Sequence, residues 1–247
     1  MGKSDPKSET RSEAARIVRA PRKTSSATSG RPARRPASAK TETPYHHGAL
    51  REALLQAAER VLERDGLAGL TLRAVAREAG VSHAAPTHHF GDLTGLLSEL
   101  AAVGFRQFNA AMASACDTAT TPLARALARP KAYVAYAQAH PGMYGIMFRT
   151  ERLDYSRPSL HEAAEASFAG LANAIGAMRQ EQISGDALTM EQGAAIARAW
   201  SMVHGFTTLL LDGRLEDILG RLPAGTTAER LLESMLTAPI SGKLPGP

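Results

Sequence analysis

The stretch that decides the fold is residues 71–90, TLRAVAREAGVSHAAPTHHF. Thr71 is a good helix N-cap, and the apolar residues after it recur at helical spacing and give one apolar face. These residues are Leu72, Val75, Ala76 and Ala79. Gly80 then supplies a left-handed or tight turn at little cost, and Ser82 is suited to cap a following helix. The stretch therefore predicts a helix, a three-residue turn and a second short helix that begins near His83.

This spacing is typical of a DNA-binding helix-turn-helix, in which the second helix enters the major groove. A helical hairpin inside an ordinary all-α core has the same local pattern, so the preceding residues decide between the two. There, YHHGALREALLQAAERVLERDG places apolar residues on one helical face and ends at Gly66, a natural helix C-cap. Those apolar residues are Leu50, Leu54, Ala57, Val61 and Leu62. Together the three helices predict a compact DNA-binding head.

Residues 47–104 resemble the N-terminal domain of the tetracycline-repressor (TetR) family of bacterial transcriptional regulators. The resemblance rests on the two alanines before Val61, the Asp-Gly at 65–66, Thr71, Val75-Ala76, Ala79-Gly80-Val81-Ser82, His89-Phe90 and Leu96-Leu97. Thr87 and Leu93 depart from it, because the family usually has tyrosine and lysine there and uses both to hold the DNA backbone.

The head yields a set of predicted DNA contacts. Residues expected to face base edges are His83, Ala84, Ala85, Thr87 and His88. Thr71, Arg73 and His89 are expected to hold phosphates, and Ser82 lies at the start of the same surface. The predicted partner is a double-stranded DNA operator.

The rest of the chain has no strand-like alternation and is predicted to be helical throughout, which makes the fold class all-α. Prolines at 122, 130, 141 and 158 divide it. The predicted helices span about 92–116, 122–139, 142–149, 158–182, 189–212 and 226–237. The segments 132–148 and 199–215 resemble the C-terminal domain of one TetR subgroup named for its Trp, His and Gly, here Trp200, His204 and Gly205. Pro86 also suits that subgroup.

Helix 189–212 is predicted to have two working faces. One is a stripe of small residues that allows another helix to approach closely, and we expect it to be the homodimer contact. Its residues are Ala194, Ala197, Ser201, Gly205 and Thr208. The other face, with Trp200, Val203 and His204, is expected to point into the domain. Helix 226–237 is expected to complete a four-helix bundle with the two-fold mate.

The body is rich in aromatic and methionine side chains, which suit a small-molecule cavity. The predicted ligand residues are Phe105, Phe108, Met112, Tyr133, Tyr136, Tyr144, Met147, Phe168, Trp200 and His204. Any one of them taken alone is more simply explained as core packing. The family implies a pocket, and the expected lining carries few formal charges, so the predicted effector is small and apolar or weakly polar.

Composition indicates the domain boundaries and argues against several classes of protein. Residues 1–44 carry eleven basic and four acidic residues and almost nothing apolar, so we expect a disordered basic tail that is either a non-specific DNA arm or a solvated extension. The predicted domains are a head at 45–104, a ligand-binding and dimerisation domain at 105–240 and a flexible C-terminus at 241–247. No apolar run reaches membrane-spanning length, and Cys116 is the only cysteine, so a cytoplasmic protein is expected.

Two functions from different classes follow. The first is a ligand-responsive, dimeric DNA-binding regulator, expected to be a repressor that ligand releases from a palindromic operator. The alternative is a helical small-molecule binding protein without specific DNA recognition. Neither an enzyme nor a cofactor is expected, because no nucleophile, base and orienting group have a recognisable spacing. The histidines at 46, 47, 83, 88 and 89 lack the convergent ligand set of a metal site.

Overall fold

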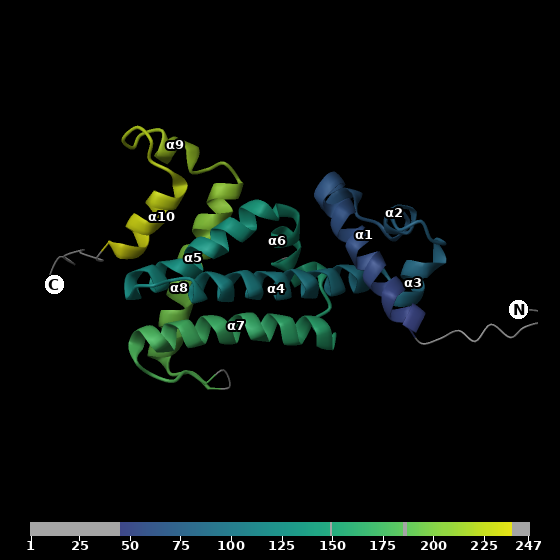
Figure 1. The fold of residues 1–247 in the computed structure, drawn as a ribbon, viewed down its shortest axis with the longest axis horizontal. Helices are drawn as coiled ribbons and strands as arrows, with labels where there is room; N and C mark the ends of the chain where they lie inside the picture. Colours follow the sequence, from purple (N-terminus) through teal and green to yellow (C-terminus); the bar gives the residue numbers. More distant parts are fainter. Residues whose placement is uncertain (1–44, 149, 185–186, 239–247) are drawn as a thin grey trace, which may run out of the picture. The chain divides into compact units, whose positions relative to one another are not determined.

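The computed structural model describes residues 45–148, 150–184 and 187–238, and all regular secondary structure in these ranges is helical. The predicted tail at 1–44 and C-terminus at 241–247 lie outside the described residues. The helices are α1 (Tyr45–Gly69), α2 (Leu72–Glu78), α3 (Ala84–Phe90), α4 (Leu93–Asp117), α5 (Pro122–Ala139), α6 (Pro141–Met147), α7 (Pro158–Arg179), α8 (Met190–Leu211), α9 (Glu216–Leu219) and α10 (Ala228–Thr237), with a short 3₁₀ turn, η1, at Thr150–Arg152. The all-α prediction is confirmed (Figure 1).

The head consists of α1, α2 and α3 around one apolar core. Leu54, Val61 and Val75 are fully buried there, and Phe90 at the end of α3 is 1% exposed. Thr71 caps α2 as predicted, because its Oγ1 accepts a hydrogen bond from the Ala74 amide at 3.1 Å. The turn after α2 contains Gly80 at φ +67°, a left-handed backbone that glycine adopts without strain. The predicted helix-turn-helix is therefore present.

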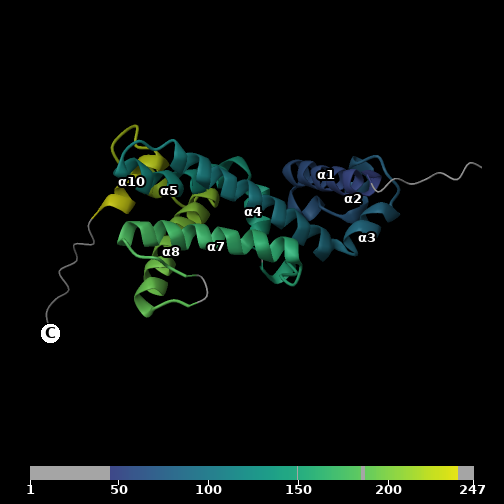
Figure 2. The same cartoon turned by 60° about the horizontal axis from the view of Figure 1, so that its bottom comes forward.

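Helix α4 connects the head to the rest of the described chain. Asp92 caps it, since its carboxylate accepts a hydrogen bond from the Gly95 amide at 2.8 Å. Beyond the head, α4 packs against α5, α6 and α7, and α7 lies alongside it in two views (Figures 1 and 2). Gly104 permits the close approach of α6, because a Cβ there would lie 2.7 Å from Cγ of Met143. The predicted boundary at residue 104 thus falls within one continuous helix.

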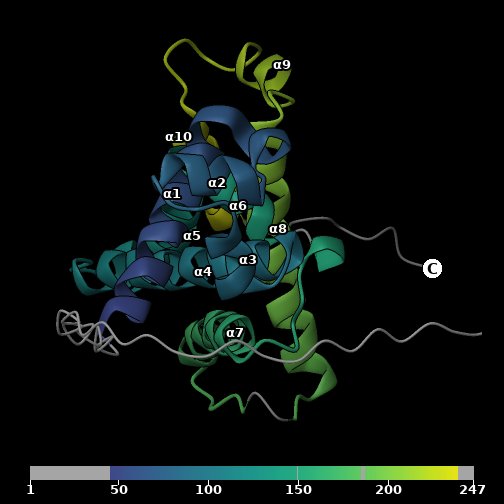
Figure 3. The same ribbon diagram turned by 90° about the vertical axis from the view of Figure 1, so that its right-hand side faces the viewer.

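Helices α8 and α10 complete the body. α8 packs on α5 and α7 and runs crosswise to α7 (Figures 1 and 3). α10 packs on α5, where Leu232 is 1% exposed and contacts a small cluster that includes Val134 and Phe206. Leu232 of α10 thus faces the interior of the protomer, whereas Met235 on the same helix is 37% exposed.

Several predicted boundaries need correction. Gly66 has φ +66° and ψ −176° and kinks α1, but one more turn follows and ends at Gly69. α7 ends at Arg179, not near 182, because Gln180 adopts the left-handed conformation at φ 56° and stops the helix. The short elements η1 and α9 were not predicted. Among the described helices, none has the length and apolarity that crossing a membrane requires.

Candidate functional site

The recognition-helix face is the part of the head that α3 presents outward. We define it as His83, Ala84, Thr87 and His88, whose side chains are all exposed. Residues of the opposite side of α3, Pro86 and Phe90, are buried and hold the helix on the head. Because α3 is anchored by one side only, the other side is free to enter a groove about 12 Å wide.

The remaining predicted DNA residues surround this face. Thr71 and Arg73 are exposed at the start of α2, whereas Ala85 and His89 are half-buried at the flank of α3. Ser82 is exposed, but the prediction that its side chain caps α3 is wrong. The N-cap position is His83, with helical backbone angles and no side-chain cap, and the Ser82 main-chain carbonyl accepts the bond from Ala85 instead. Ser82 therefore keeps its hydroxyl at the surface.

Ion pairs fasten α2, the helix before the turn, onto α1. Glu78 of α2 accepts hydrogen bonds from Arg60 and Arg64 of α1, both at 2.9 Å. These bonds to Arg60 and then Arg64 lower the pKa of Glu78 below its ordinary value. The pairs lie at the surface, so each contributes little to stability. They join α2, the helix before the turn, to α1.

Eight of the ten predicted ligand residues lie in or against one cluster of aromatic and methionine side chains in the body. Ring centroids lie 5.0 Å apart for Phe108 and Tyr133, 5.4 Å for Phe108 and Tyr136, and 5.9 Å for Tyr133 and Tyr144. Phe148, which was not among the predicted ligand residues, is 4.9 Å from both Tyr144 and His204. The others in the same core are Phe105, Met112 and Met147, all buried. Direct ring contacts show that most of these side chains fill the core.

Polar atoms converge at one edge of that cluster. The hydroxyls of Tyr133 and Tyr144 each lie 2.9 Å from Nδ1 of His204 and 3.4 Å from one another. Burial lowers the pKa of His204 below its ordinary value and raises the pKa of both tyrosines. A neutral imidazole offers one lone pair at Nδ1, so the two phenols compete for it. The edge is therefore a small polar site of two phenols and one imidazole within an otherwise apolar cluster.

Two predicted ligand residues lie outside the buried part of this cluster. Trp200 is 45% exposed, so the expectation that it points into the body is wrong. It lies between the buried and exposed sides of α8, and its ring centroid is 6.2 Å from that of His204. Phe168 packs in a separate cluster of α7 and α8 with Ala172, Ile183 and Ile196. It does not join the other aromatic residues.

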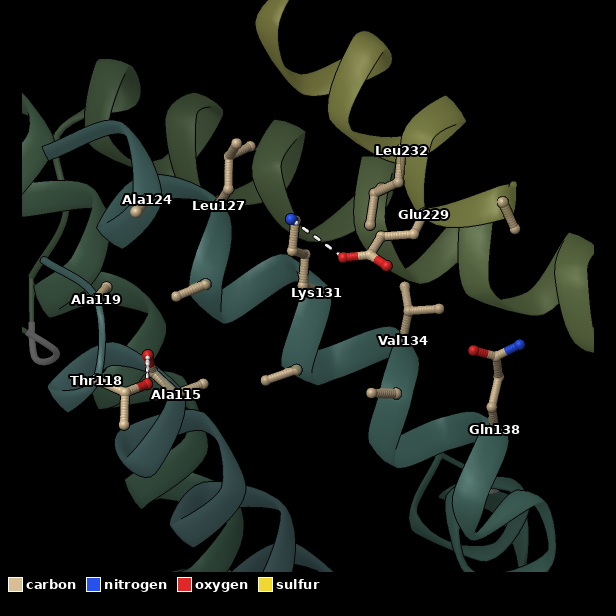
Figure 4. A pocket seen from close by; sticks show the side chains of 14 residues that line it. Ala115, Thr118, Ala119, Ala124, Leu127, Lys131, Val134, Gln138, Glu229 and Leu232 are labelled. Atoms are coloured by element: carbon tan, nitrogen blue, oxygen red, sulfur yellow. Dashed lines mark hydrogen bonds and ion pairs between the residues drawn. The ribbon is translucent and has the colours of Figure 1, made fainter. Parts of the chain in front are cut away.

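A hollow of about 450 Å³ lies where the end of α4, α5 and α10 meet (Figure 4). Its walls are largely alanine, leucine and valine, among them Ala115, Ala128 and Leu232. At its rim, Lys131 forms ion pairs with Glu229, at 3.1 Å, and with Glu233. None of the ten predicted ligand residues lines it. Alanine side chains are short and therefore leave this space open. The aromatic and methionine residues that suggested a cavity in the sequence gave no indication of it.

The α8 face is the set of small residues predicted to contact a second copy: Ala194, Ala197, Ser201, Gly205 and Thr208. All are exposed except Gly205, which is half-buried. A Cβ at Gly205 would meet no atom within 4 Å. The face is thus an outward surface of the protomer, adjoining Trp200 and His204 along the same helix.

We expect the protein to lose stability in acid through His204. Its pKa in the folded state lies below the unfolded value of about 6.5, so the unfolded chain binds more protons in that window and the free energy of unfolding falls as pH falls below it. Above the unfolded pKa, His204 is neutral in both states, so its contribution to the free energy of unfolding no longer changes with pH. Thermal unfolding at pH 8.0 and 5.5 should show a larger loss for the wild type than for His204→Gln, and equal losses would contradict this assignment.

This architecture, an outward recognition helix on a three-helix head joined to an all-helical body, defines a helix-turn-helix DNA-binding regulator. Residues 54–100 match the profile of bacterial regulatory proteins of the tetR family, and residues 124–238 match that of the tetracyclin repressor-like C-terminal domain. The chain belongs to the TetR family of transcriptional regulators.

Solved structures share this fold. A protein of unknown function from Rhodococcus sp. RHA1 is 35% identical, with a TM-score of 0.62, over 79% of this chain and 95% of that one. A TetR family transcription regulator from Marinobacter aquaeolei VT8 is 14% identical, with a TM-score of 0.53, over 78% of this chain and 96% of that one, and shares the fold. Comparison with curated proteins gave no match.

Proposed function

We propose that this regulator acts as a homodimer in which the recognition-helix faces of two protomers occupy successive major grooves of a palindromic operator. The observation that carries the proposal is the exposed set His83, Ala84, Thr87 and His88 on a helix anchored by buried Pro86 and Phe90. The α8 face supports the dimer, since its small side chains allow close helix packing and contact nothing else in the protomer at Gly205. The expected action is repression.

A small, largely apolar effector is proposed to release the operator by favouring a second arrangement of the body. Its proposed site is the edge of the aromatic cluster at Tyr133, Tyr144 and His204, next to exposed Trp200. The two phenols and the imidazole there offer hydrogen-bonding partners for a polar group of the ligand, and the surrounding rings offer apolar contact. Trp200 is the only tryptophan, so its fluorescence reports ligand entry directly.

Two substitutions test the DNA part of this proposal. His88→Ala, on the recognition-helix face, should change which bases are preferred when duplexes are selected from a random pool, because it removes a side chain at the base edges. Arg73→Ala, on α2, should weaken all sequences alike, because a phosphate contact carries no sequence information. If His88→Ala returned the wild-type motif, this face would not read bases. If the wild type enriched no motif at all, the protein would be a small-molecule binding protein without specific DNA recognition.

A further inference from the structure

A group of charged and backbone atoms connects the recognition helix to the body. We call it the Arg157 cluster and define it as Arg51, Phe90, Gly95, Glu99 and Arg157. Arg157 stands in the turn just before α7, in the body. Its Nη2 donates a hydrogen bond to the Phe90 carbonyl at 3.0 Å, 67 residues earlier in the chain. That carbonyl lies at the C-terminal end of α3, so a body residue binds the last turn of the helix that enters DNA.

A buried carboxylate holds Arg157 in this position. Glu99 of α4 is 8% exposed, and its Oε1 lies 3.7 Å from Nη1 of Arg157. Its other oxygen, Oε2, pairs with Arg51 of α1 and accepts a hydrogen bond from the Ser159 hydroxyl at 2.8 Å. Glu99 therefore binds the head through Arg51 and the start of α7 through Arg157 and Ser159. Because a charge at this depth is costly without partners, the cluster favours one geometry.

Neighbouring contacts make the cluster rigid. Gly95 leaves the space that the Arg157 guanidinium occupies, since a Cβ there would lie 2.9 Å from Cζ of Arg157. Arg51 also lies 5.7 Å from the ring centroid of Phe90. The turn before α7 is tied to α4 separately, because the Asp154 amide donates to the Ser98 hydroxyl at 2.8 Å. The end of α3, the start of α4 and the start of α7 thus meet at one point.

We propose that Arg157 is a positioning residue that fixes the angle of α3 relative to the body and so sets the spacing of operator half-sites that the dimer accepts. The inference rests on the proposed dimeric function. From Arg157, α7 runs along α4 and is bonded to it where Asn109 donates to the Ala163 carbonyl at 3.2 Å. α7 then packs on α8, which carries the proposed dimer face. The cluster therefore lies between the surface that binds DNA and the helix that relates the two protomers.

The test compares operators that differ only in the distance between half-sites. Using duplexes selected by the full-length wild type, affinity is measured for the selected spacing and for spacings one base pair longer and shorter. Arg157→Ala should reduce the preference for the selected spacing by about five- to tenfold, within the range of typical coupling between sites. Arg157→Lys, which can bind the Phe90 carbonyl or Glu99 but not both with a planar fork, should give an intermediate loss. Arg106→Ala, at an exposed position on α4, is the matched control and should keep the wild-type preference.

A purely structural role would weaken all spacings equally, and that result, or an unchanged preference in Arg157→Ala, would overturn the proposal. Glu99→Gln gives an independent check, since it removes one of the two carboxylate charges that pair with Arg157, the other being Asp154 at 3.6 Å, while an amide oxygen still accepts from Ser159. Glu99→Gln should also reduce the preference for the selected spacing. An unchanged preference would count against the proposed role of the cluster. If the wild type itself selected no paired half-sites, the proposed dimeric function would fail. If the wild type selected paired half-sites and every variant kept the wild-type preference for their spacing, only the proposed role of Arg157 would fail.

Discussion

Replacing Gly205 with leucine is expected to convert the protein to a monomer that no longer holds its operator, while each protomer stays folded. Within the protomer a Cβ at this position would meet no atom within 4 Å, so the side chain starts in open space and the protomer is expected to tolerate it. In a dimer packed through the α8 face, the leucines would push the two helices apart. Overpacking of this kind costs about 1–3 kcal/mol per site, and the two-fold axis brings two such sites together. The measurement is sedimentation of the free protein, with operator affinity measured on the same samples.

Gly145→Leu is the control for that prediction. Gly145 lies on α6, not on α8, and a Cβ there also has no atom within 4 Å. It should leave the dimer and operator binding close to wild type. A Gly205→Leu protein that sediments as a dimer and binds operator normally would show that the protomers meet elsewhere.

Gly95→Ala, near the start of α4, is expected to be strongly destabilising for the addition of a single methyl group. The new Cβ would collide with the Phe90 main-chain oxygen and with the Arg157 guanidinium. Since Phe90 is 1% exposed in the core and its carbonyl ends α3, backbone must move to make room. We expect a loss of about 1–3 kcal/mol in the free energy of unfolding, as for other overpacked sites, together with weaker operator binding. Urea unfolding followed by circular dichroism measures the first quantity.

Gly145→Ala on α6 provides the comparison, because no atom lies within 4 Å of a Cβ at that position. An alanine inside a helix is favoured over glycine by roughly 0.5–1 kcal/mol, so this variant should be as stable as the wild type or more so. Equal unfolding midpoints for the two alanine variants would mean that the start of α4 relaxes freely and that the contact of Gly95 with α3 is not a constraint.

Local signals in the sequence predicted most of the fold. Thr71 and Asp92 cap the helices that they were expected to begin, and helix 122–139 has the predicted bounds. These features depend on residues within a few positions of one another. Periodic apolar spacing therefore sufficed to place them.

The features that could not be predicted from the sequence depend on contacts between residues that are far apart in the chain. Trp200 was assigned to the interior because most of α8 is apolar or small, and only its packing on α5 and α7 decides which side is covered. Phe168 has the same composition signal as the other aromatic residues but a different neighbourhood. Arg157 had no signal, because its partners Phe90 and Glu99 are distant in sequence and Arg157 stands among other charged residues.

The central claim is tested most directly by the number of protomers that bind a selected operator and by the distance between its half-sites. Full-length protein is used to select duplexes from random DNA, and the complex with the selected duplex is then sedimented and footprinted. The account predicts two protomers on one duplex, protecting two inverted half-sites whose centres lie about 34–36 Å apart, or a multiple of that distance. One protomer on a single unrepeated site, or a selection that enriches no sequence, would contradict it.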